Sequence, residues 1–282
     1  MTSVPEKVGV IGGGRMGAGI AQVFAEAGSS VTIIERDDEA AAAARARLED
    51  GVGKAATRVA TVDADATLAR LDVQTDYGAL APASLVVEAV PEVLELKVDA
   101  LTSAARVVGP DAWLTTNTSS LPVSELADRL PAPERLCGLH FFNPVPPSAL
   151  VEIVVTERTA DELRDRAQDW VAALGKAAIV VHDAPGFASS RLGNAIALEA
   201  MRMVEEGVAS AADIDAAMVL GYRHATGPLR TSDLVGLDVR LGIAEFLHDA
   251  LGERFAPPQI LRNKVAAGEL GRKTGKGFFE YH

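Results

Sequence analysis

The sequence predicts an α/β protein in which a doubly wound sheet is followed by a smaller all-α C-terminal domain. Short β-branched runs alternate with helical stretches over roughly the first 180 residues. The first of these runs ends in a glycine-rich turn. After residue 185 the pattern is almost entirely helical. Together these observations favour a largely parallel sheet with helices on both faces, joined to a helical domain.

The first elements are a strand, a turn, a helix and a second strand. Residues 7–11, Lys-Val-Gly-Val-Ile, are typical of a buried strand, and residues 12–17 form a tight glycine turn. The next stretch carries apolar residues at helical spacing and stops at Gly28, and a second strand spans residues 31–34. This order begins a parallel βαβ unit.

Later elements continue the alternation. Further strands are predicted at residues 73–76, 84–89, 112–116, 136–141, 151–155 and 178–181, and helices at residues 40–58, 94–107, 123–129 and 162–174. The character of the chain changes at Pro185. We therefore expect one domain over residues 1–184 and a second over residues 185–282.

The second domain is predicted to be helical throughout. One stripe of its first helix is apolar and is formed by Leu192, Ile196, Met203 and Val204. Ser210 is expected to cap the next helix, with Asp213 closing a capping box. Gly227-Pro228 breaks the pattern before a helix at residues 233–251, and Pro257-Pro258 begins the last helix.

Composition and charge exclude several classes of protein. The 282 residues carry a formal net charge of −12, whereas a non-specific nucleic-acid binder needs a basic face. No apolar run is long enough to span a bilayer, and residues 1–3 lead into a strand without a signal peptide, so no membrane partner is expected. The single cysteine, Cys137, cannot form an internal disulfide, which fits a cytoplasmic protein with a buried thiol.

The glycine turn has the spacing Gly12-x-Gly14-x-x-Gly17, with a strand before it and a helix after it. In a Rossmann-type unit the first glycine allows the turn, the second lets a pyrophosphate approach, and the third lets the helix pack on the strand. The helix N-terminus then offers N–H groups to the phosphates. Met16 lies inside this turn and is counted with the predicted cofactor contacts.

An acidic residue, Glu35, ends the second strand. A carboxylate there accepts hydrogen bonds from both ribose hydroxyls of a dinucleotide and repels a 2′-phosphate. The predicted cofactor is therefore NAD rather than NADP, although the neighbouring Arg36 would favour a 2′-phosphate. FAD is disfavoured because a chain of 282 residues leaves little room for the larger flavin-binding architecture.

Three polar fragments lie at or near strand ends of the first domain, where open α/β sheets bind ligands. Residues 116–120 read Thr-Asn-Thr-Ser-Ser after one strand, His140 and Asn143 occur at the next, and Glu152 lies inside the one after. Taken alone, residues 116–120 are typical of a turn and helix cap, His140 of a structural histidine, and Glu152 of a surface carboxylate. Together they predict proton transfer, because histidine titrates near neutral pH and a fixed carboxylate orients its ring.

This spaced set resembles the L-3-hydroxyacyl-CoA dehydrogenase family, which includes the bacterial 3-hydroxybutyryl-CoA dehydrogenases. The resemblance covers nearly the whole chain. Beyond the glycine turn, its motifs are Val87-Glu88-Ala89-Val90-Pro91-Glu92, Asn117-Thr118-Ser119-Ser120, His140-Phe141-Phe142-Asn143-Pro144-Val145, Pro185-Gly186-Phe187 and Gly271-Arg272-Lys273-Thr274-Gly275-Lys276-Gly277-Phe278.

The resemblance implies a reversible, NAD-dependent oxidation of an L-3-hydroxyacyl-CoA to the 3-oxoacyl-CoA. By this resemblance His140 is the general base for the 3-hydroxyl, Glu152 pairs with it, and Ser119 hydrogen-bonds the reacting oxygen. The positions implied to lie around the nicotinamide half of NAD are Glu92, Lys97 and Asn117, and Asn143 is counted with them as a brace of the active-site loop.

One motif departs from the family pattern. The family usually has Pro-Gly-Phe-x-x-Asn-Arg, and Ser190 stands here in place of the asparagine that would contact the substrate. Ser190 is therefore a candidate catalytic residue with a shorter side chain and a single donor. Asn194, one helical turn further on, is expected to supply the missing amide to the same face.

CoA is expected to meet a basic pair, Lys54 and Arg58, one turn apart on a helix, although a solvated helix face explains this pair equally well. The apolar stripes of the second domain and the resemblance suggest a homodimer through that domain. A metal is not expected, because the histidines other than His140 lack a ligand spacing: His182, His224, His248 and His282.

Other interpretations stay open. Related dehydrogenases act on a sugar acid or on a hydroxyacyl group held by a carrier protein, and the motifs exclude neither. Enzymes of this scaffold that use a catalytic lysine, such as the 3-hydroxyisobutyrate and 6-phosphogluconate dehydrogenases, are disfavoured by His140 and Glu152. A non-catalytic NAD-binding protein is an alternative of a different class, favoured only by the loss of the asparagine.

Overall fold

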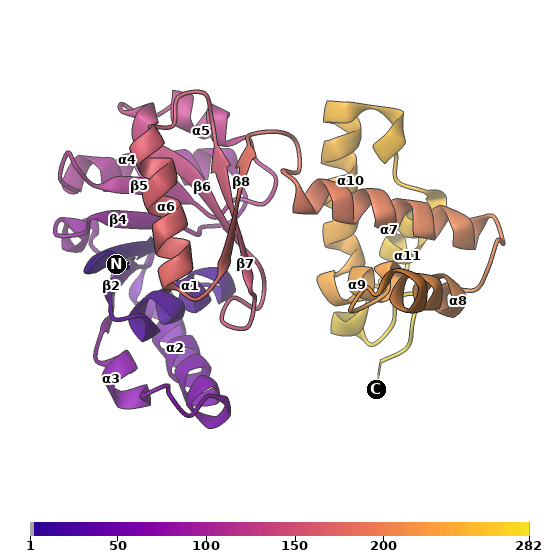
Figure 1. Ribbon diagram of the computed structural model, residues 1–282, viewed down its shortest axis with the longest axis horizontal. Helices are drawn as coiled ribbons and strands as arrows, with labels where there is room; N and C mark the ends of the chain where they lie inside the picture. The colour runs from indigo at the N-terminus through magenta and orange to yellow at the C-terminus, as the bar shows by residue number, and fades with distance from the viewer. Residues whose placement is uncertain (1–2, 282) are drawn as a thin grey trace. The chain divides into compact units, whose positions relative to one another are not determined.

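The computed structural model describes residues 3–281 (Figure 1). Residues 1–2 and 282 lie outside the described residues. The expectation of no signal peptide rests partly on residues 1–2, and the argument from histidine spacing rests partly on residue 282. The chain divides into two compact units, Met1–Asp183 and Ala184–His282, and each is described by itself.

The first unit is built on a sheet of eight strands. They are β1 Lys7–Ile11, β2 Ser30–Ile34, β3 Leu71–Gln74, β4 Leu85–Glu88, β5 Trp113–Thr116, β6 Leu136–Phe141, β7 Leu150–Val155 and β8 Ala177–His182. The spatial order is β3-β2-β1-β4-β5-β6-β7-β8. Strands β1 to β6 run parallel, β7 pairs antiparallel with β6, and β8 pairs parallel with β7.

Helices cover both faces of this sheet, with α6 on one face and α4 on the other (Figure 1). The helices of the first unit are α1 Arg15–Glu26, α2 Asp38–Arg58, α3 Ala64–Leu68, α4 Leu94–Val107, α5 Val123–Asp128 and α6 Asp161–Ala173. Alternate strand residues such as Val8, Val10, Leu139 and Phe141 share one apolar core with α1, α2 and α6. The predicted doubly wound α/β sheet is therefore confirmed.

One short helix was not predicted, and one predicted strand has different bounds. Helix α3 has a single turn, and Asp63 caps it by accepting a hydrogen bond from the Ala66 N–H at 3.0 Å. Strand β3 ends at Gln74 rather than at Asp76, because the Asp76 carboxylate accepts from the Gly78 N–H at 2.9 Å and begins a 3₁₀ turn. Periodicity over four or five residues is too short to reveal such elements.

The described part of the second unit is helical, as predicted, apart from two isolated β-bridges near its end. Its helices are α7 Ser189–Glu205, α8 Ala211–Ala216, α9 Pro228–Val235, α10 Leu237–Leu251 and α11 Gln259–Ala266. The single helix expected over residues 233–251 is wrong: α9 begins at Pro228, and Gly236 separates it from α10. Gly236 has φ +107, which a right-handed helix does not allow, whereas proline fits the first turn of a helix.

Ser210 caps the start of α8 as expected, but the side chain of Asp213 makes a different contact from the one predicted. The Asp213 N–H donates to Ser210 Oγ at 3.2 Å, which confirms the cap. The Asp213 carboxylate accepts from the Ser210 hydroxyl at 2.6 Å. Asp213 therefore holds the capping hydroxyl itself, instead of closing the box on the backbone N–H.

The apolar stripe predicted on α7 is divided: Met203 and Val204 pack against the core of the second unit, whereas its first two residues do not. Leu192 and Ile196 are 64% and 39% exposed. The residues of α7 that enter the apolar core are Ala197, Leu198, Ala200 and Met201. An uncovered stripe of this kind is typical of a surface that another molecule covers. Within the described residues, no helix has both the length and the apolar character that crossing a membrane requires.

Candidate active site

His140 and Glu152 face each other across the one antiparallel strand pair of the described sheet. His140 on β6 is in direct register with Glu152 on β7, so both side chains leave the sheet on the same face. His140 Nδ1 lies 2.7 Å from Glu152 Oε2, and both residues are buried. A buried carboxylate at this distance fixes the ring and stabilises the imidazolium that forms when the histidine accepts a proton.

The segment after β6 is held in place on both sides. The Phe142 ring packs against the His140 ring, with centroids 4.6 Å apart. Lys176 is buried and donates through Nζ to the carbonyl oxygens of Val145, Pro146 and Ser148. Burial lowers the pKa of Lys176. Three carbonyl acceptors explain why an amine is placed here, and they brace the loop that carries Asn143 and leads into β7.

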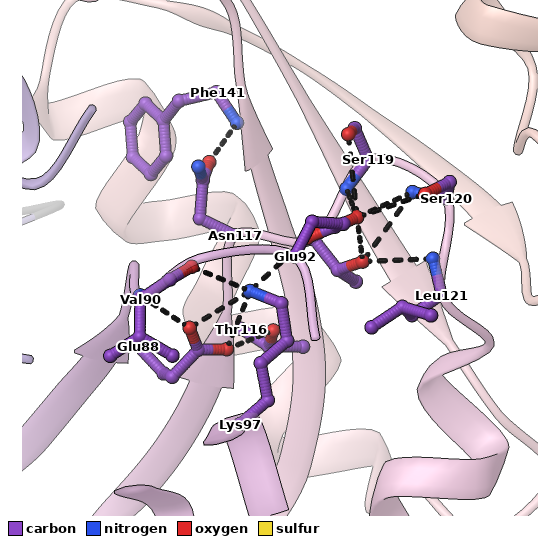
Figure 2. A network of polar contacts seen from close by, with 11 residues as sticks. Glu88, Val90, Glu92, Lys97, Thr116, Asn117, Ser119, Ser120, Leu121 and Phe141 are labelled. Carbon is purple, nitrogen blue, oxygen red and sulfur yellow. Dashed lines mark hydrogen bonds and ion pairs between the residues drawn. The ribbon is translucent and has the colours of Figure 1, made fainter. Parts of the chain in front are cut away.

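Glu92 is the centre of a second polar network, at the end of β5 (Figure 2). Its Oε1 accepts from the Thr118 hydroxyl at 2.6 Å and from the backbone N–H groups of Ser119 and Ser120 at 2.9 and 3.0 Å. The Ser119 hydroxyl is 3.4 Å away, which is a long contact. The backbone of Ser119 is thus fixed while its hydroxyl is only weakly engaged.

These contacts lower the pKa of Glu92 to about 2. Burial alone would raise it, but the Lys97 charge and the hydrogen bonds from Thr118, Ser119 and Ser120 outweigh burial. Glu92 is therefore a permanent anion near neutral pH. It organises the chain after β5 rather than serving as a proton donor.

Lys97 is buried between two carboxylates. Its Nζ lies 2.9 and 3.1 Å from the two oxygens of Glu88 and 3.2 Å from Glu92 Oε2. Glu88 also accepts from the Thr116 hydroxyl at 2.6 Å and from the Val90 N–H at 2.7 Å. Figure 2 shows Lys97 and Glu88 beneath the segment that carries Glu92. Lys97 therefore links α4 to the ends of β4 and β5.

Asn117 ties two neighbouring strand ends together. Its Oδ1 accepts from the Phe141 N–H at 2.9 Å, so the end of β5 is fastened to the end of β6 (Figure 2). Since Thr116 pairs with Gly138 in the parallel register, Ser119 and His140 both lie at the carboxyl edge of these two strands. This is the edge at which open α/β sheets bind ligands.

The glycine turn has the geometry that a pyrophosphate requires. Gly12 has φ +91, and a Cβ on Gly17 would lie 1.8 Å from the Gly12 carbonyl oxygen. A Cβ on Gly14 would meet no atom within 4 Å, so the space beside Gly14 is open. The N-terminus of α1 has no side-chain cap and no acidic residue in its first turn. Each glycine therefore has the backbone geometry that its position in the motif requires.

A cavity of about 960 Å³ opens at this turn. It is lined by residues that follow β1, β2 and β4, at the point where the strand order reverses. The predicted cofactor contacts among its lining residues are Gly12, Gly14, Met16 and Glu35. Glu35 Oε1 accepts from the Gly13 N–H at 2.7 Å, and Arg36 is paired with Asp37 at 3.0 Å. The shape, the open glycine and the acidic residue fit NAD.

A second cavity, of about 680 Å³, lies between α2 and the loop after β6. Lys54, Arg58 and Asn143 all line it, together with Arg15 and Arg47. Lys54 is exposed and paired with Asp50 at 2.6 Å. The expected basic pair thus belongs to a group of four cations, and two acids, Glu26 and Asp50, line the same cavity. Asn143 was predicted as a cofactor contact, but it lines this cavity and not the glycine-turn cavity.

In the second unit, Asn194 does not offer the expected amide. It is fully buried, and its Nδ2 donates to the Ser190 carbonyl oxygen at 2.9 Å. The donor intended for a substrate is therefore used inside α7, because an i to i−4 bond was available to it. Ser190 remains as the polar group at the position of the family's asparagine.

Sequence reasoning missed Glu88, Lys176, Arg15 and Arg47. Glu88 had a detectable sign, since it is a lone acid at the end of an apolar strand. Lys176 and the two arginines had none, because a basic residue on a helix or turn is usually solvated. No cluster of three potential metal ligands occurs in the described part of the chain.

A doubly wound sheet with a glycine turn, an acidic β2 end and a buried histidine–carboxylate pair defines a dinucleotide-dependent dehydrogenase. Comparison with family models agrees. The model for the 3-hydroxyacyl-CoA dehydrogenase NAD-binding domain matches residues 7–184, and that for the 3-hydroxyacyl-CoA dehydrogenase C-terminal domain matches residues 186–281. The chain belongs to the 3-hydroxyacyl-CoA dehydrogenase family, and its cofactor is NAD.

Individual relatives cover the whole chain. A 3-hydroxybutyryl-CoA dehydrogenase of Mycobacterium tuberculosis is 41% identical over 286 residues, covering 100% of both chains. A probable 3-hydroxybutyryl-CoA dehydrogenase of Deinococcus radiodurans is 40% identical, covering 98% of this chain and 100% of the relative. Among solved structures, FadB2 of M. tuberculosis matches with a TM-score of 0.94 at 40% identity, covering 99% of this chain and 100% of FadB2. The (S)-3-hydroxybutyryl-CoA dehydrogenase PaaH1 of Ralstonia eutropha gives a TM-score of 0.93 at 35% identity, with 99% of each chain covered.

Proposed function

We propose that this protein catalyses the reversible, NAD-dependent oxidation of an L-3-hydroxyacyl-CoA to the 3-oxoacyl-CoA. The observation that carries the proposal is the buried pair of His140 Nδ1 and Glu152 Oε2 at 2.7 Å. Because Nδ1 is paired with Glu152, Nε2 is proposed as the ring atom that exchanges a proton with the 3-hydroxyl. NAD, when bound, supplies the acceptor for the hydride that leaves C3.

The protein's own residues handle the proton and the oxygen. His140 takes the proton of the 3-hydroxyl as the C3–H bond breaks, and returns it in the reverse reaction. Glu152 keeps the ring in one tautomer and stabilises the imidazolium, and general-base catalysis of this kind contributes about 10²–10⁴-fold in rate. Ser119 is proposed to hydrogen-bond the reacting oxygen, because its hydroxyl is only weakly held by Glu92 at 3.4 Å. Ser190 contacts the substrate from α7.

The cofactor contacts are proposed in two groups. Gly12, Gly14, Met16 and Glu35 hold the pyrophosphate and adenosine half, which the 960 Å³ cavity supports. Glu92 and Asn117 serve the nicotinamide half from the carboxyl edge of β4 and β5. Lys97 contributes by fixing Glu92, because its Nζ is already engaged by Glu88 and Glu92.

The CoA phosphates are proposed to bind the basic cavity beside α2. Lys54 and Arg58 were expected there, and Arg15 and Arg47 line the same space. Four cations against two acids leave an excess of positive charge around this cavity, which suits a ligand with several phosphate charges. Asn143, on the far wall of this cavity, is proposed to hold the loop between the CoA end and His140.

The two domains are proposed to divide the work. Residues 1–184 bind NAD and carry the proton-transfer pair, while residues 185–282 bind substrate and form a homodimer. The exposed Leu192 and Ile196 support such an interface. We also propose a cytoplasmic location, which rests on the lone Cys137: it is buried, forms no disulfide, and has its pKa raised to about 12 by burial.

Turnover across a series of acyl chains tests the proposal. NADH oxidation is followed by absorbance with 3-oxoacyl groups of increasing length, each presented on CoA and on an acyl carrier protein. We expect turnover on CoA, with a lower kcat/KM on the carrier protein, because the basic cavity is formed for free CoA phosphates. NADH binding without turnover of any 3-oxoacyl thioester would instead indicate a non-catalytic NAD-binding protein.

A further inference from the structure

Arg240 is a buried arginine with no partner. It lies in the first turn of α10 and is only 7% exposed. Its side chain makes no hydrogen bond or ion pair with any described residue, and Nε is completely cut off from solvent. A buried guanidinium is normally paired, because removing its charge from water without compensation costs free energy.

The charge of Arg240 persists near neutral pH and is reinforced by its position. Burial lowers its pKa to about 10, so the group is still a cation at pH 7. It sits at the N-terminal end of α10, where the helix dipole is also positive. The acidic residue nearest to Arg240 in the sequence is Asp238, which is paired with Lys273. Both carboxylate oxygens of Asp238 lie 2.6 Å from Lys273 Nζ. Asp238 therefore does not neutralise the charge of Arg240.

The guanidinium lies against α7, about one helical turn from Ser190, the residue that replaces the family's asparagine. Helices α7 and α10 pack together in the second unit (Figure 1). Arg240 Nη1 is 3.6 Å from the point where a Cβ on Gly193 would lie. Gly193 is three residues beyond Ser190 and therefore shares its side of α7. The adjacent Asn194 Oδ1 is also buried without a partner, so this part of the unit is polar and incompletely satisfied.

We propose that Arg240 binds a carboxylate at the far end of the acyl chain, so that the preferred substrate is a 3-hydroxyacyl-CoA with an acidic terminus. This inference rests on the proposed function, which places substrate at Ser190. A neutral thioester or keto oxygen would leave the charge of Arg240 uncompensated. A carboxylate neutralises it and accepts two parallel N–H bonds from the guanidinium fork.

The test compares pairs of L-3-hydroxyacyl-CoA substrates of equal chain length, one ending in a methyl group and one in a carboxylate. The wild-type protein should prefer the carboxylate member by about 10- to 100-fold in kcat/KM, the range expected for a charge-assisted hydrogen bond. Arg240→Met should abolish this preference and leave the methyl member within about twofold. Arg240→Lys, which keeps the charge in a smaller group, should retain part of it.

Arg262→Met is the matched control. It removes an equal charge from the same unit, but Arg262 is half-exposed and paired with Glu245 at 2.6 Å, so the preference should persist. A wild-type protein that turns over both substrates of a pair equally would overturn the inference while leaving the proposed function intact.

Equal losses of kcat/KM on both substrates in Arg240→Met would also overturn it, because Arg240 would then serve every substrate. A shift of Arg240→Met toward monomer, with the preference unchanged, would mean that a partner subunit supplies the anion. Absence of turnover with either member would instead count against the proposed function.

Discussion

At the scale of single residues, the candidate site of the first unit contains three carboxylates, each held by a different partner. Glu152 is held by His140, Glu92 by hydroxyl and N–H donors with Lys97, and Glu35 by the N–H of Gly13. A carboxylate's partner decides what it does. An imidazole makes it an orienting charge for proton transfer, whereas a set of fixed donors makes it a structural anchor.

Glu35 should determine the choice between NAD and NADP. Glu35→Ala removes the charge that repels a 2′-phosphate and leaves Arg36 beside it, so the kcat/KM ratio of NADP to NAD should rise by about tenfold or more. Both values are measured by absorbance with one substrate. Glu39→Ala, which removes another acid from the same cavity, should leave the ratio close to wild type. An unchanged ratio in Glu35→Ala would remove Glu35 from this role.

Glu92 should make the folded state sensitive to acid. Its pKa is about 2 in the folded protein against an ordinary 4.5, so its stabilising contribution is complete above pH 4.5 and is lost as the pH falls toward 2. Partial exposure of the side chain, 34%, reduces the size of this contribution. Glu92→Gln should therefore be less stable than wild type at neutral pH and should lose less stability on acidification.

Urea unfolding at a series of pH values measures this difference. Glu162→Gln, an exposed acid paired with Arg166 on α6, is the control and should follow the wild-type pH dependence. Parallel curves for wild type and Glu92→Gln would show that the network around Glu92 does not contribute to acid sensitivity.

At the scale of elements, the buried Lys97 joins α4 to the strand ends that carry the polar network. Lys97→Met should destabilise the protein by about 3–5 kcal/mol, because Glu88 would be left as an uncompensated buried charge. Adding Glu88→Gln to this variant should recover a large part of the loss. Equilibrium unfolding of the single and double variants measures both effects. A double variant that is as unstable as Lys97→Met would show that lost packing, rather than charge, is responsible.

Much of this architecture was predictable because strand and helix periodicities and the glycine spacing are local patterns. The partners of Lys97 and Lys176 were not, since a lysine that ends against buried acceptors has the same sequence pattern as a solvated one. The break at Gly236 was missed because glycine also occurs inside helices, and only its φ of +107 decides the matter. The pairing of His140 with Glu152 was expected from resemblance, but the antiparallel register that places them opposite each other depends on tertiary structure.

At the scale of the whole molecule, the proposed homodimer places the exposed stripe of α7 in an interface. Leu192→Glu combined with Ile196→Glu should convert the dimer to a monomer, because two charges would be buried against apolar surface. Sedimentation velocity measures the change. The control is Val59→Glu, which alters an exposed apolar residue of the first unit and should leave a dimer. A double variant that remains dimeric would place the interface elsewhere.

The central claim is that His140 moves the proton while other residues bind the cofactor. A single-turnover measurement of NADH oxidation with acetoacetyl-CoA, paired with NADH binding by fluorescence, tests it most directly. His140→Ala should bind NADH with wild-type affinity and lose activity by about 10²–10⁴-fold. Glu152→Gln should show a smaller loss, because the ring remains hydrogen-bonded without the stabilising charge. Wild-type rates in His140→Ala would contradict the claim.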